Sequence, residues 1–210
     1  MYVSPGAMRR TRTLADLIGG DSRVRDGVLI VAFSAFMALC ARISIPLPGT
    51  PVPITGQTLA LLLTGAILGP RRGALAMVLY LAEGAMGLPV FAPSAVLPQG
   101  IWRLLGPTGG YLFSYPLVAA LVGWLATRGW DRRIPSALLM FLVGNVVVYL
   151  FGVSWLNLFR GTFGQLSVMW AGVYPFLLGD AIKIGLAALA LPGAWALFGK
   201  RSEDEVSSRK

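Results

Sequence analysis

The sequence predicts an all-α membrane protein in which six transmembrane helices form a compact bundle and both termini lie in the cytoplasm. Of the 210 residues, 56% are apolar and only 13% are charged, whereas a soluble domain carries about 25% charged residues. The apolar residues form continuous runs and do not alternate as in a transmembrane β-strand. At about 20 apolar residues per crossing, the chain holds enough of them for roughly six helices.

The composition also excludes several classes of protein. The chain has one cysteine and no histidine, so it lacks an internal disulfide and the imidazole that zinc hydrolases and Ser-His-Asp enzymes use. No secretory signal is expected, because the first 27 residues are polar and contain five arginines. No Walker A pattern occurs, so any ATP would have to be handled by another chain.

Six apolar segments define the expected helices. They comprise residues 28–45, 55–68, 73–88, 108–127, 134–151 and 171–198. The second and third are short for a full crossing, so we expect them to be tilted or assisted by flanking loops. The predicted organisation is a cytoplasmic N-terminal segment (1–27), a membrane domain (28–198) and a cytoplasmic tail (199–210) that we expect to be disordered.

The cations predict the orientation of these helices. Fourteen of the 18 lysines and arginines lie in the two termini and in the turns before the third and fifth segments, on one side of a six-helix zigzag. The opposite loops hold only Arg103 and Arg160. Because lysine and arginine accumulate in cytoplasmic loops, the cation-rich side is expected to face the cytoplasm.

Two longer loops lie on the opposite, outer side. Residues 46–54 contain Pro48, Pro51 and Pro53, which predict a stiff, non-helical connection. Residues 88–107 mix prolines, glycines and aromatic residues with Arg103. These loops either fold over the bundle or act as ordinary connectors.

Polar side chains inside the apolar segments are the candidates for function, because a charge within a membrane is costly. In the six-helix topology they all fall in the outer half of the membrane. They are Arg42, Gln57, Glu83, Asn145, Asp180 and Lys183. This placement predicts a polar pocket that opens outward.

The chemistry of these groups suits a polar ligand, although each has a structural alternative. Asp180 and Lys183 share one helix face, so they form either a self-neutralising ion pair or a set of acceptors and donors for a ligand. Asn145 can donate and accept at once, which suits a urea or amide group, or it can make an interhelical hydrogen bond. For Arg42 and Glu83 we favour mutual pairing or extension to the membrane surface.

Small residues in the first segment permit close approach of another helix. They include Ser34, Ala35 and Ala38. They serve either packing within the bundle or docking of a membrane partner.

Six ordered blocks of sequence are distinctive over roughly residues 28–195. They are Pro53-Ile54-Thr55-Gly56-Gln57-Thr58-Leu59, Gly69-Pro70-Arg71-Arg72-Gly73, Gly87-Leu88-Pro89-Val90-Phe91, Leu105-Gly106-Pro107-Thr108-Gly109-Gly110-Tyr111, Gly144-Asn145 with Tyr149 and Gly152, and Pro175-Phe176 with Gly179-Asp180 and Lys183. These blocks resemble the BioY family, the biotin-specific, substrate-binding S components of energy-coupling factor (ECF) transporters.

The resemblance implies a membrane subunit that captures biotin in an outward-facing pocket and performs no covalent chemistry. It implies three partner chains, namely a transmembrane coupling protein and two ABC-type ATPases, and location in a bacterial cytoplasmic membrane. The small-residue face of the first helix would dock to the coupling protein. Biotin would be the ligand and ATP would act only through the partners, with no covalently bound cofactor, no metal and no nucleic acid.

Biotin also matches the polar and aromatic residues of the pocket. Its ureido ring needs donors and acceptors, and its thiophane ring and chain need apolar walls. Asn145, Asp180, Lys183 and Gln57 are the expected polar contacts, Tyr111 and Phe91 the expected aromatic walls, and Arg103 the expected partner of the carboxylate. The backbone amides of residues 108–110, at a helix start, are an alternative anion site.

Two other functions remain as alternatives. One is the same fold serving another vitamin, such as thiamin or riboflavin. The other is an intramembrane enzyme, which is disfavoured because Asp180 has only Lys183 close to it in sequence and no histidine exists.

Overall fold

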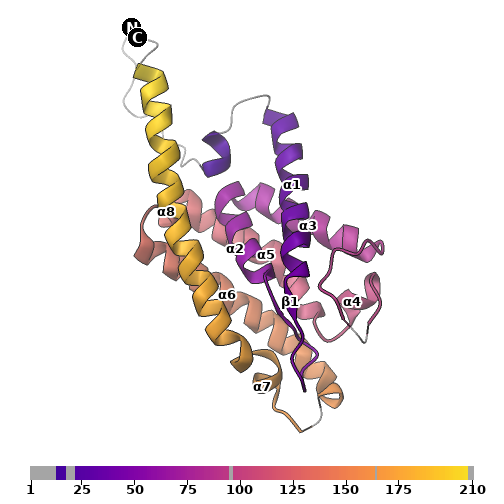
Figure 1. The fold of residues 1–210 in the computed structure, drawn as a ribbon. Helices are drawn as coiled ribbons and strands as arrows, with labels where there is room; N and C mark the ends of the chain where they lie inside the picture. The colour runs from indigo at the N-terminus through magenta and orange to yellow at the C-terminus, as the bar shows by residue number, and fades with distance from the viewer. Residues whose placement is uncertain (1–12, 18–21, 95–96, 164, 208–210) are drawn as a thin grey trace.

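The computed structural model describes residues 13–17, 22–94, 97–163 and 165–207, and this part of the chain is mostly helical (Figure 1). Its longer helices are α1 (Ser22–Arg42), α2 (Gln57–Leu68), α3 (Pro70–Ala85), α5 (Gly109–Thr127), α6 (Ile134–Leu156) and α8 (Leu177–Ser207). Each apolar segment predicted from the sequence overlaps one of these six helices. The helical fold class is therefore confirmed.

Short elements connect these helices. They are η1 (Leu14–Leu17), α4 (Ile101–Leu105), η2 (Trp130–Arg132), η3 (Asn157–Thr162), α7 (Val168–Gly172) and η4 (Tyr174–Phe176). Two short antiparallel strands, β1 (Ser44–Ile45) and β2 (Ile54–Thr55), pair in the register Ser44 to Thr55 and Ile45 to Ile54. They close the base of the proline-rich loop, which is non-helical as predicted.

Among the described residues, four helical stretches are long and apolar enough to cross a membrane. They are Arg23–Arg42, Gly109–Thr127, Ile134–Gly161 and Val168–Leu197. By contrast, α2 has 12 residues, or about 18 Å at 1.5 Å per residue, against a hydrocarbon core of about 30 Å. The multi-pass character therefore rests on α1, α5, α6 and the stretch that ends in α8.

Helix α5 lies at the centre of the bundle, where it packs against α2, α3 and α6. Twelve of its 19 residues are buried. Helix α1 covers α3, and α8 packs against α6 and α2. The outer faces of the helices carry large exposed apolar side chains such as Leu39, Leu150 and Leu178, as expected for helices that contact lipid.

The two ends of the bundle differ in their elements (Figure 1). The start of α1, η1 and the last turns of α8 lie at one end, which we call the terminal end. The β1–β2 pair, α4 and α7 lie toward the opposite end, which we call the loop end. The starts of α2, α5 and α8 therefore face the loop end, together with the second half of α6.

The structure corrects the predicted limits of the last segments. The sixth segment, expected from Ala171 as one helix, begins as α7 and η4, and the continuous helix α8 starts only at Leu177. Val173 has non-helical dihedrals (φ −133°, ψ −63°) and separates α7 from η4, and Pro175 lies within η4, just before α8 begins. Asp180 therefore lies in the first turn of α8 and not nine residues into a helix.

The ends of α6 and α8 also differ from the prediction. Helix α6 continues to Leu156, five residues beyond the expected end of the fifth segment. Residues 199–207 continue α8, which differs from the disordered tail that we expected there. Arg9, Arg10, Arg12, Arg209 and Lys210, which were counted on the cation-rich side, lie outside the described residues.

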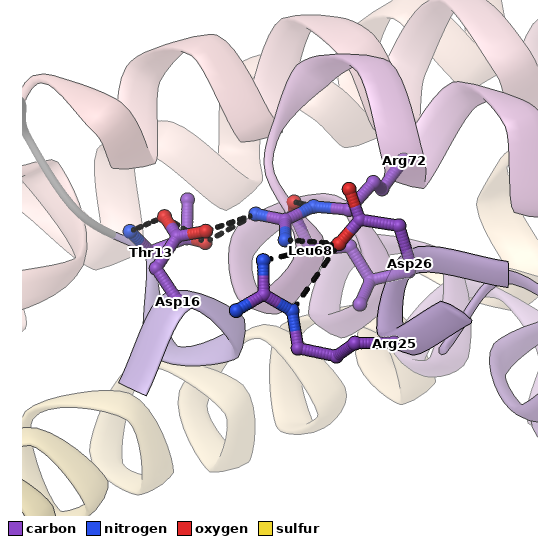
Figure 2. A network of polar contacts seen from close by, with 6 residues as sticks. All are labelled: Thr13, Asp16, Arg25, Asp26, Leu68 and Arg72. Atoms are coloured by element: carbon purple, nitrogen blue, oxygen red, sulfur yellow. Dashed lines mark hydrogen bonds and ion pairs between the residues drawn. The ribbon is translucent and has the colours of Figure 1, made fainter. Parts of the chain in front are cut away.

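Arg72 organises the terminal end (Figure 2). Its Nε donates to Leu68 O at 2.9 Å and its Nη2 pairs with Asp16 Oδ1 at 2.6 Å, while its Nη1 contacts Asp26 Oδ1 at 3.1 Å. Thr13 donates to Asp16 Oδ2 from both its backbone N–H (2.9 Å) and its hydroxyl (3.0 Å). One guanidinium thus joins η1, the start of α1 and the turn between α2 and α3.

The turn that presents Arg72 depends on glycine. Gly69 lies between α2 and α3 with φ +82°, a backbone conformation that residues other than glycine rarely adopt. Pro70 then starts α3, where its missing N–H costs no helical hydrogen bond. The block Gly69 to Gly73 therefore encodes a tight reversal that ends in a fixed arginine.

The Arg72 network makes an acid-sensitive contribution to stability. Burial raises the pKa of Asp16, but the hydrogen bonds from Thr13 and the pairing with Arg72 outweigh it, so the pKa lies below the ordinary value of 3.8. Because the folded pKa is lower than the unfolded one, this stabilisation is present above the unfolded pKa and is lost as pH falls through the folded pKa. We predict that the melting temperature of the detergent-purified protein falls less between about pH 5 and pH 3 in Asp16→Asn than in the wild type. Equal losses in both proteins would contradict this role of Asp16.

Candidate functional site

A cavity at the loop end collects most of the side chains that the sequence predicts as ligand contacts. Its walls come from the starts of α2, α5 and α8, from the second half of α6, and from α4 and the loops that precede α2 and α4. Six of the seven predicted contacts line it. They are Gln57, Phe91, Arg103, Tyr111, Asp180 and Lys183.

Asp180 is the centre of the polar part of this cavity. Its Oδ2 accepts from the Tyr149 hydroxyl at 2.6 Å and from Asn145 Nδ2 at 3.3 Å, and its Oδ1 pairs with Lys183 Nζ at 3.0 Å. The Asp180 side chain is 7% exposed and that of Lys183 is 17% exposed. The carboxylate also lies in the first turn of α8, where a negative charge is favoured by the helix dipole. The predicted Asp180–Lys183 pair therefore forms, and Lys183 still borders the cavity.

Asn145 lies behind this pair and is not among the residues that line the cavity. It is 5% exposed, and its Nδ2 is used on Asp180 while its Oδ1 is buried without a hydrogen-bond partner. A buried acceptor without a partner costs free energy. A ligand N–H that reached this oxygen would remove the penalty. The structure thus makes Asn145 a support of Asp180 that keeps one acceptor unused.

Arg103 provides a second, separate charge. It lies on α4 with 6% exposure, its Nη2 donates to Ala92 O, and its Nε is buried without a partner. Burial lowers the pKa of this guanidinium, and in the part of the chain that the structure describes no carboxylate pairs with it. An anion at this position would satisfy both the charge and the free Nε.

A group of aromatic residues also lines the cavity. It contains Phe91, Tyr111, Tyr115 and Phe176. The Tyr111 hydroxyl donates to Gly172 O at 2.8 Å, so the ring borders the cavity while its polar tip joins α5 to α7. A Cβ on Gly152 would lie 2.2 Å from the Tyr111 ring. Gly152, at the contact between α5 and α6, therefore leaves the space that the Tyr111 ring occupies.

Gln57 connects the cavity to the core. Its Nε2 donates to the Tyr80 hydroxyl at 2.9 Å, and that hydroxyl donates to Val90 O at 3.2 Å. The Tyr80 ring meets Phe91 edge to face at a centroid distance of 5.4 Å. Together, these contacts of Gln57 and Tyr80 hold the loop that precedes α4 against α2 and α3.

The backbone alternative for an anion site is weaker than Arg103. Thr108 borders the cavity, but the Gly109 N–H donates to Gly106 O at 2.9 Å. That amide is therefore already used within the turn.

Sequence reasoning missed several residues of the site. Tyr149, Tyr115, Phe176 and Thr55 all line the cavity. Tyr149 had a usable signal, because it lies four residues after Asn145 and thus on the same helix face. Tyr115 had none, because a tyrosine in a long apolar run is equally typical of the core.

Other predicted residues lie away from the cavity. Arg42 donates to Pro89 O, and Ser34 Oγ donates to Glu83 Oε2 at 2.5 Å. Within the described residues Arg42 and Glu83 form no ion pair with each other, so the pairing that we favoured is wrong, since each has a partner on another element. Ser34 is fully buried, Ala38 is half-buried and Ala35 is exposed, so of the three docking candidates only Ala35 lies openly on the surface.

The site has one carboxylate and two cations among its lining residues. It lacks the paired carboxylates that acid–base catalysis in such a cavity would use. Its chemistry suits binding of a ligand that carries both hydrogen-bonding groups and an anion.

Comparison with known proteins agrees with this description. The model of the BioY family matches residues 9–200. The chain is 35% identical over 167 residues to a probable biotin transporter BioY of Pyrococcus horikoshii, which covers 80% of this chain and 94% of that protein. It is 38% identical over 157 residues to the biotin transporter BioY of Thermotoga maritima, and this alignment covers 75% of this chain and 88% of that protein.

A solved structure shares the fold. The S-component for biotin from an ECF-type ABC transporter, solved by crystallography at 2.1 Å, superposes with a TM-score of 0.69. The two sequences are 24% identical, and the alignment covers 83% of this chain and 93% of that chain. The match to the family model over most of the chain, together with two relatives above 30% identity, shows that the chain belongs to the BioY family.

Proposed function

We propose that this chain is the substrate-binding membrane subunit for biotin uptake, the S component of an ECF transporter. Membership of the BioY family supports this function, and so do the names of the relatives, which are biotin transporters. The chain carries out no covalent chemistry in this proposal. It captures biotin and delivers it across the membrane with an ATPase-driven module.

The observation that carries the proposal is that one cavity is lined by the Asp180–Lys183 pair, by Arg103 with its unpartnered Nε, and by aromatic residues. The ureido ring of biotin would lie at Asp180, whose acceptors suit its N–H groups, with Lys183 donating to its carbonyl. Asn145 Oδ1 is a further acceptor without a partner. The thiophane ring and valeryl chain would lie against Tyr111 and Phe91, and Gln57 would add a polar contact from the start of α2.

The carboxylate of biotin would pair with Arg103 in this arrangement. The charge balance of the cavity favours an anionic ligand, because Lys183 already neutralises Asp180 while Arg103 has no acidic partner among the described residues. Thiamin is a cation and would leave Arg103 unpaired. The charges therefore favour biotin over thiamin, whereas the neutral riboflavin is disfavoured only by the lack of an anion for Arg103.

We further propose six crossings within residues 28–198 with both termini on the cytoplasmic side. The described cations at the terminal end include Arg71 and Arg72 in the first turn of α3 and Arg128, Arg132 and Arg133 between α5 and α6, and cytoplasmic loops are rich in such residues. Helices α2 and α3 are short, but eight of the 12 residues of α2 are buried. A helix enclosed by protein does not have to match the full lipid thickness, and the flanking loops complete its path.

The proposed partners are an ECF transmembrane coupling protein and two ABC-type ATPases, in the cytoplasmic membrane of a bacterium. The likeness to a solved S-component supports the class of partner. Helix α1 presents an exposed face with Val31, Ala35 and Leu39. We propose this face as the docking surface, because Ser34 on the neighbouring face is committed to Glu83.

Variants of Asp180 and Lys183 test the polar part of the cavity. Asp180→Asn removes the acceptor charge at the ureido ring, so we predict biotin binding about 10- to 100-fold weaker, the usual effect of losing a hydrogen bond to a charged group. Lys183→Ala should weaken binding to a similar degree. The matched control is Glu83→Gln, which neutralises a membrane-embedded carboxylate that does not line the cavity and should leave the affinity near that of the wild type. Titration of the purified proteins with biotin measures these affinities, and unchanged binding in both Asp180→Asn and Lys183→Ala would sink the ureido assignment.

The position of the ligand carboxylate is tested by an arginine variant. Arg103→Gln should weaken binding of biotin by about 10- to 100-fold but should weaken binding of biotin methyl ester much less, because the ester carbonyl can accept only a hydrogen bond and has no charge to pair. Arg160→Gln, at an exposed arginine of η3 that lies outside the cavity, is the control and should change neither affinity. Equal losses for the acid and the ester in Arg103→Gln would show that Arg103 acts through the fold and not on the carboxylate.

A further inference from the structure

A second and larger cavity lies directly outside the binding cavity. It encloses about 670 Å³ and is formed by the proline-rich loop, α4 and the residues after it, and η3. Arg103 and Thr108 line both cavities. The two spaces are therefore neighbours that share these residues as a common wall.

The proline-rich loop (residues 46–54) also borders both cavities. Thr50 and Pro51 line the outer cavity, and the next two residues, Val52 and Pro53, line the inner one. The boundary between the cavities thus runs along one stiff segment of chain on one side and along Arg103 on the other. A ligand group held at Arg103 lies at this boundary.

The lining of the outer cavity shows which chemistry it suits. Its large side chains are apolar or aromatic, namely Leu97, Trp102, Leu105, Phe159 and Phe163. Its hydroxyl groups come from Thr50, Ser94 and Thr108. Arg103 is the one charged residue among those that line it in the described part of the chain. Such a wall suits an alkyl chain with a few hydrogen-bonding groups.

We infer that the chain binds biotin derivatives in which the carboxyl group is extended by an amide-linked alkyl chain, with biotinyl-lysine as the representative. The ureido and thiophane rings occupy the inner cavity and the lysine part occupies the outer one. The inference rests on the proposed function, because it takes from it the orientation of biotin with the carboxyl end at Arg103.

The amide that replaces the carboxylate keeps part of the contact with Arg103. Its carbonyl oxygen accepts a hydrogen bond from the guanidinium, but the ionic part of the interaction is lost. The alkyl part of the lysine buries apolar surface against Trp102 and Leu105, which offsets some of this loss. Biotinyl-lysine should therefore bind no more than about 100-fold more weakly than biotin.

The experiment compares binding of biotin and biotinyl-lysine to the purified full chain. The test variants Leu105→Trp and Ser94→Trp add bulk at two positions of the outer cavity, and neither residue lines the inner cavity. Leu139→Trp is the control, because Leu139 is as exposed as Leu105 (49% and 48%) and lies on α6 outside both cavities. Either test variant should weaken biotinyl-lysine binding by at least about tenfold, the cost of a lost or clashing apolar contact, while biotin binding changes little and the control changes neither.

The outcomes separate the two proposals. Wild-type protein that binds biotin but not biotinyl-lysine would overturn the inference and leave the proposed function standing, with the outer cavity acting only as a passage. The inference would also fail if both test variants left biotinyl-lysine binding unchanged or weakened both ligands equally. Wild-type protein that binds neither ligand would overturn the proposed function and the inference together.

Discussion

A carboxylate buried at the loop end sets the arrangement of the binding site. Asp180 costs free energy wherever it is removed from water, so its charge must be compensated by fixed groups. Lys183 supplies the opposite charge from the next turn of α8, while Tyr149 and Asn145 supply hydrogen bonds from α6. The requirement therefore draws α6 and α8 together at the depth where the cavity lies. Lys183 still lines the cavity, whereas the unpartnered Asn145 oxygen lies behind the pair.

The two ends of the bundle use charge in opposite ways. At the terminal end Arg72 has an acceptor for every nitrogen, and its network joins η1, α1 and the α2–α3 turn into one unit. At the loop end Arg103 is buried but keeps Nε without a partner and has no acidic partner among the described residues. A satisfied guanidinium stabilises the fold, whereas an unsatisfied one is available for an anion. Helix α5 packs against α2 and α3 and so connects the two ends through one continuous core.

Much of this organisation could be predicted from residues alone, because apolar runs, glycine-proline turns and cation bias are local features of the sequence. The Asp180–Lys183 pair was predictable for the same reason, since three residues separate them on one helix. The contacts between distant elements were not predictable. Nothing local shows that Ser34 would bond to Glu83 on α3, or that Arg103 would be buried at the boundary of two cavities, because these contacts depend on how α1 and α4 pack. Pro175 is visible in the sequence, but the non-helical Val173 and the start of α8 at Leu177 are not, so the sequence predicts Asp180 further from a helix start than the structure places it.

We propose that one biotin molecule occupies the cavity that Asp180 and Arg103 line. Native mass spectrometry of the purified chain in an equimolar mixture of biotin, thiamin and riboflavin tests it most directly, because the mass of the adduct identifies the bound vitamin without a label. We expect a single adduct with the mass of one biotin per chain. An adduct of thiamin or riboflavin, or a chain that retains no vitamin from the mixture, would contradict it.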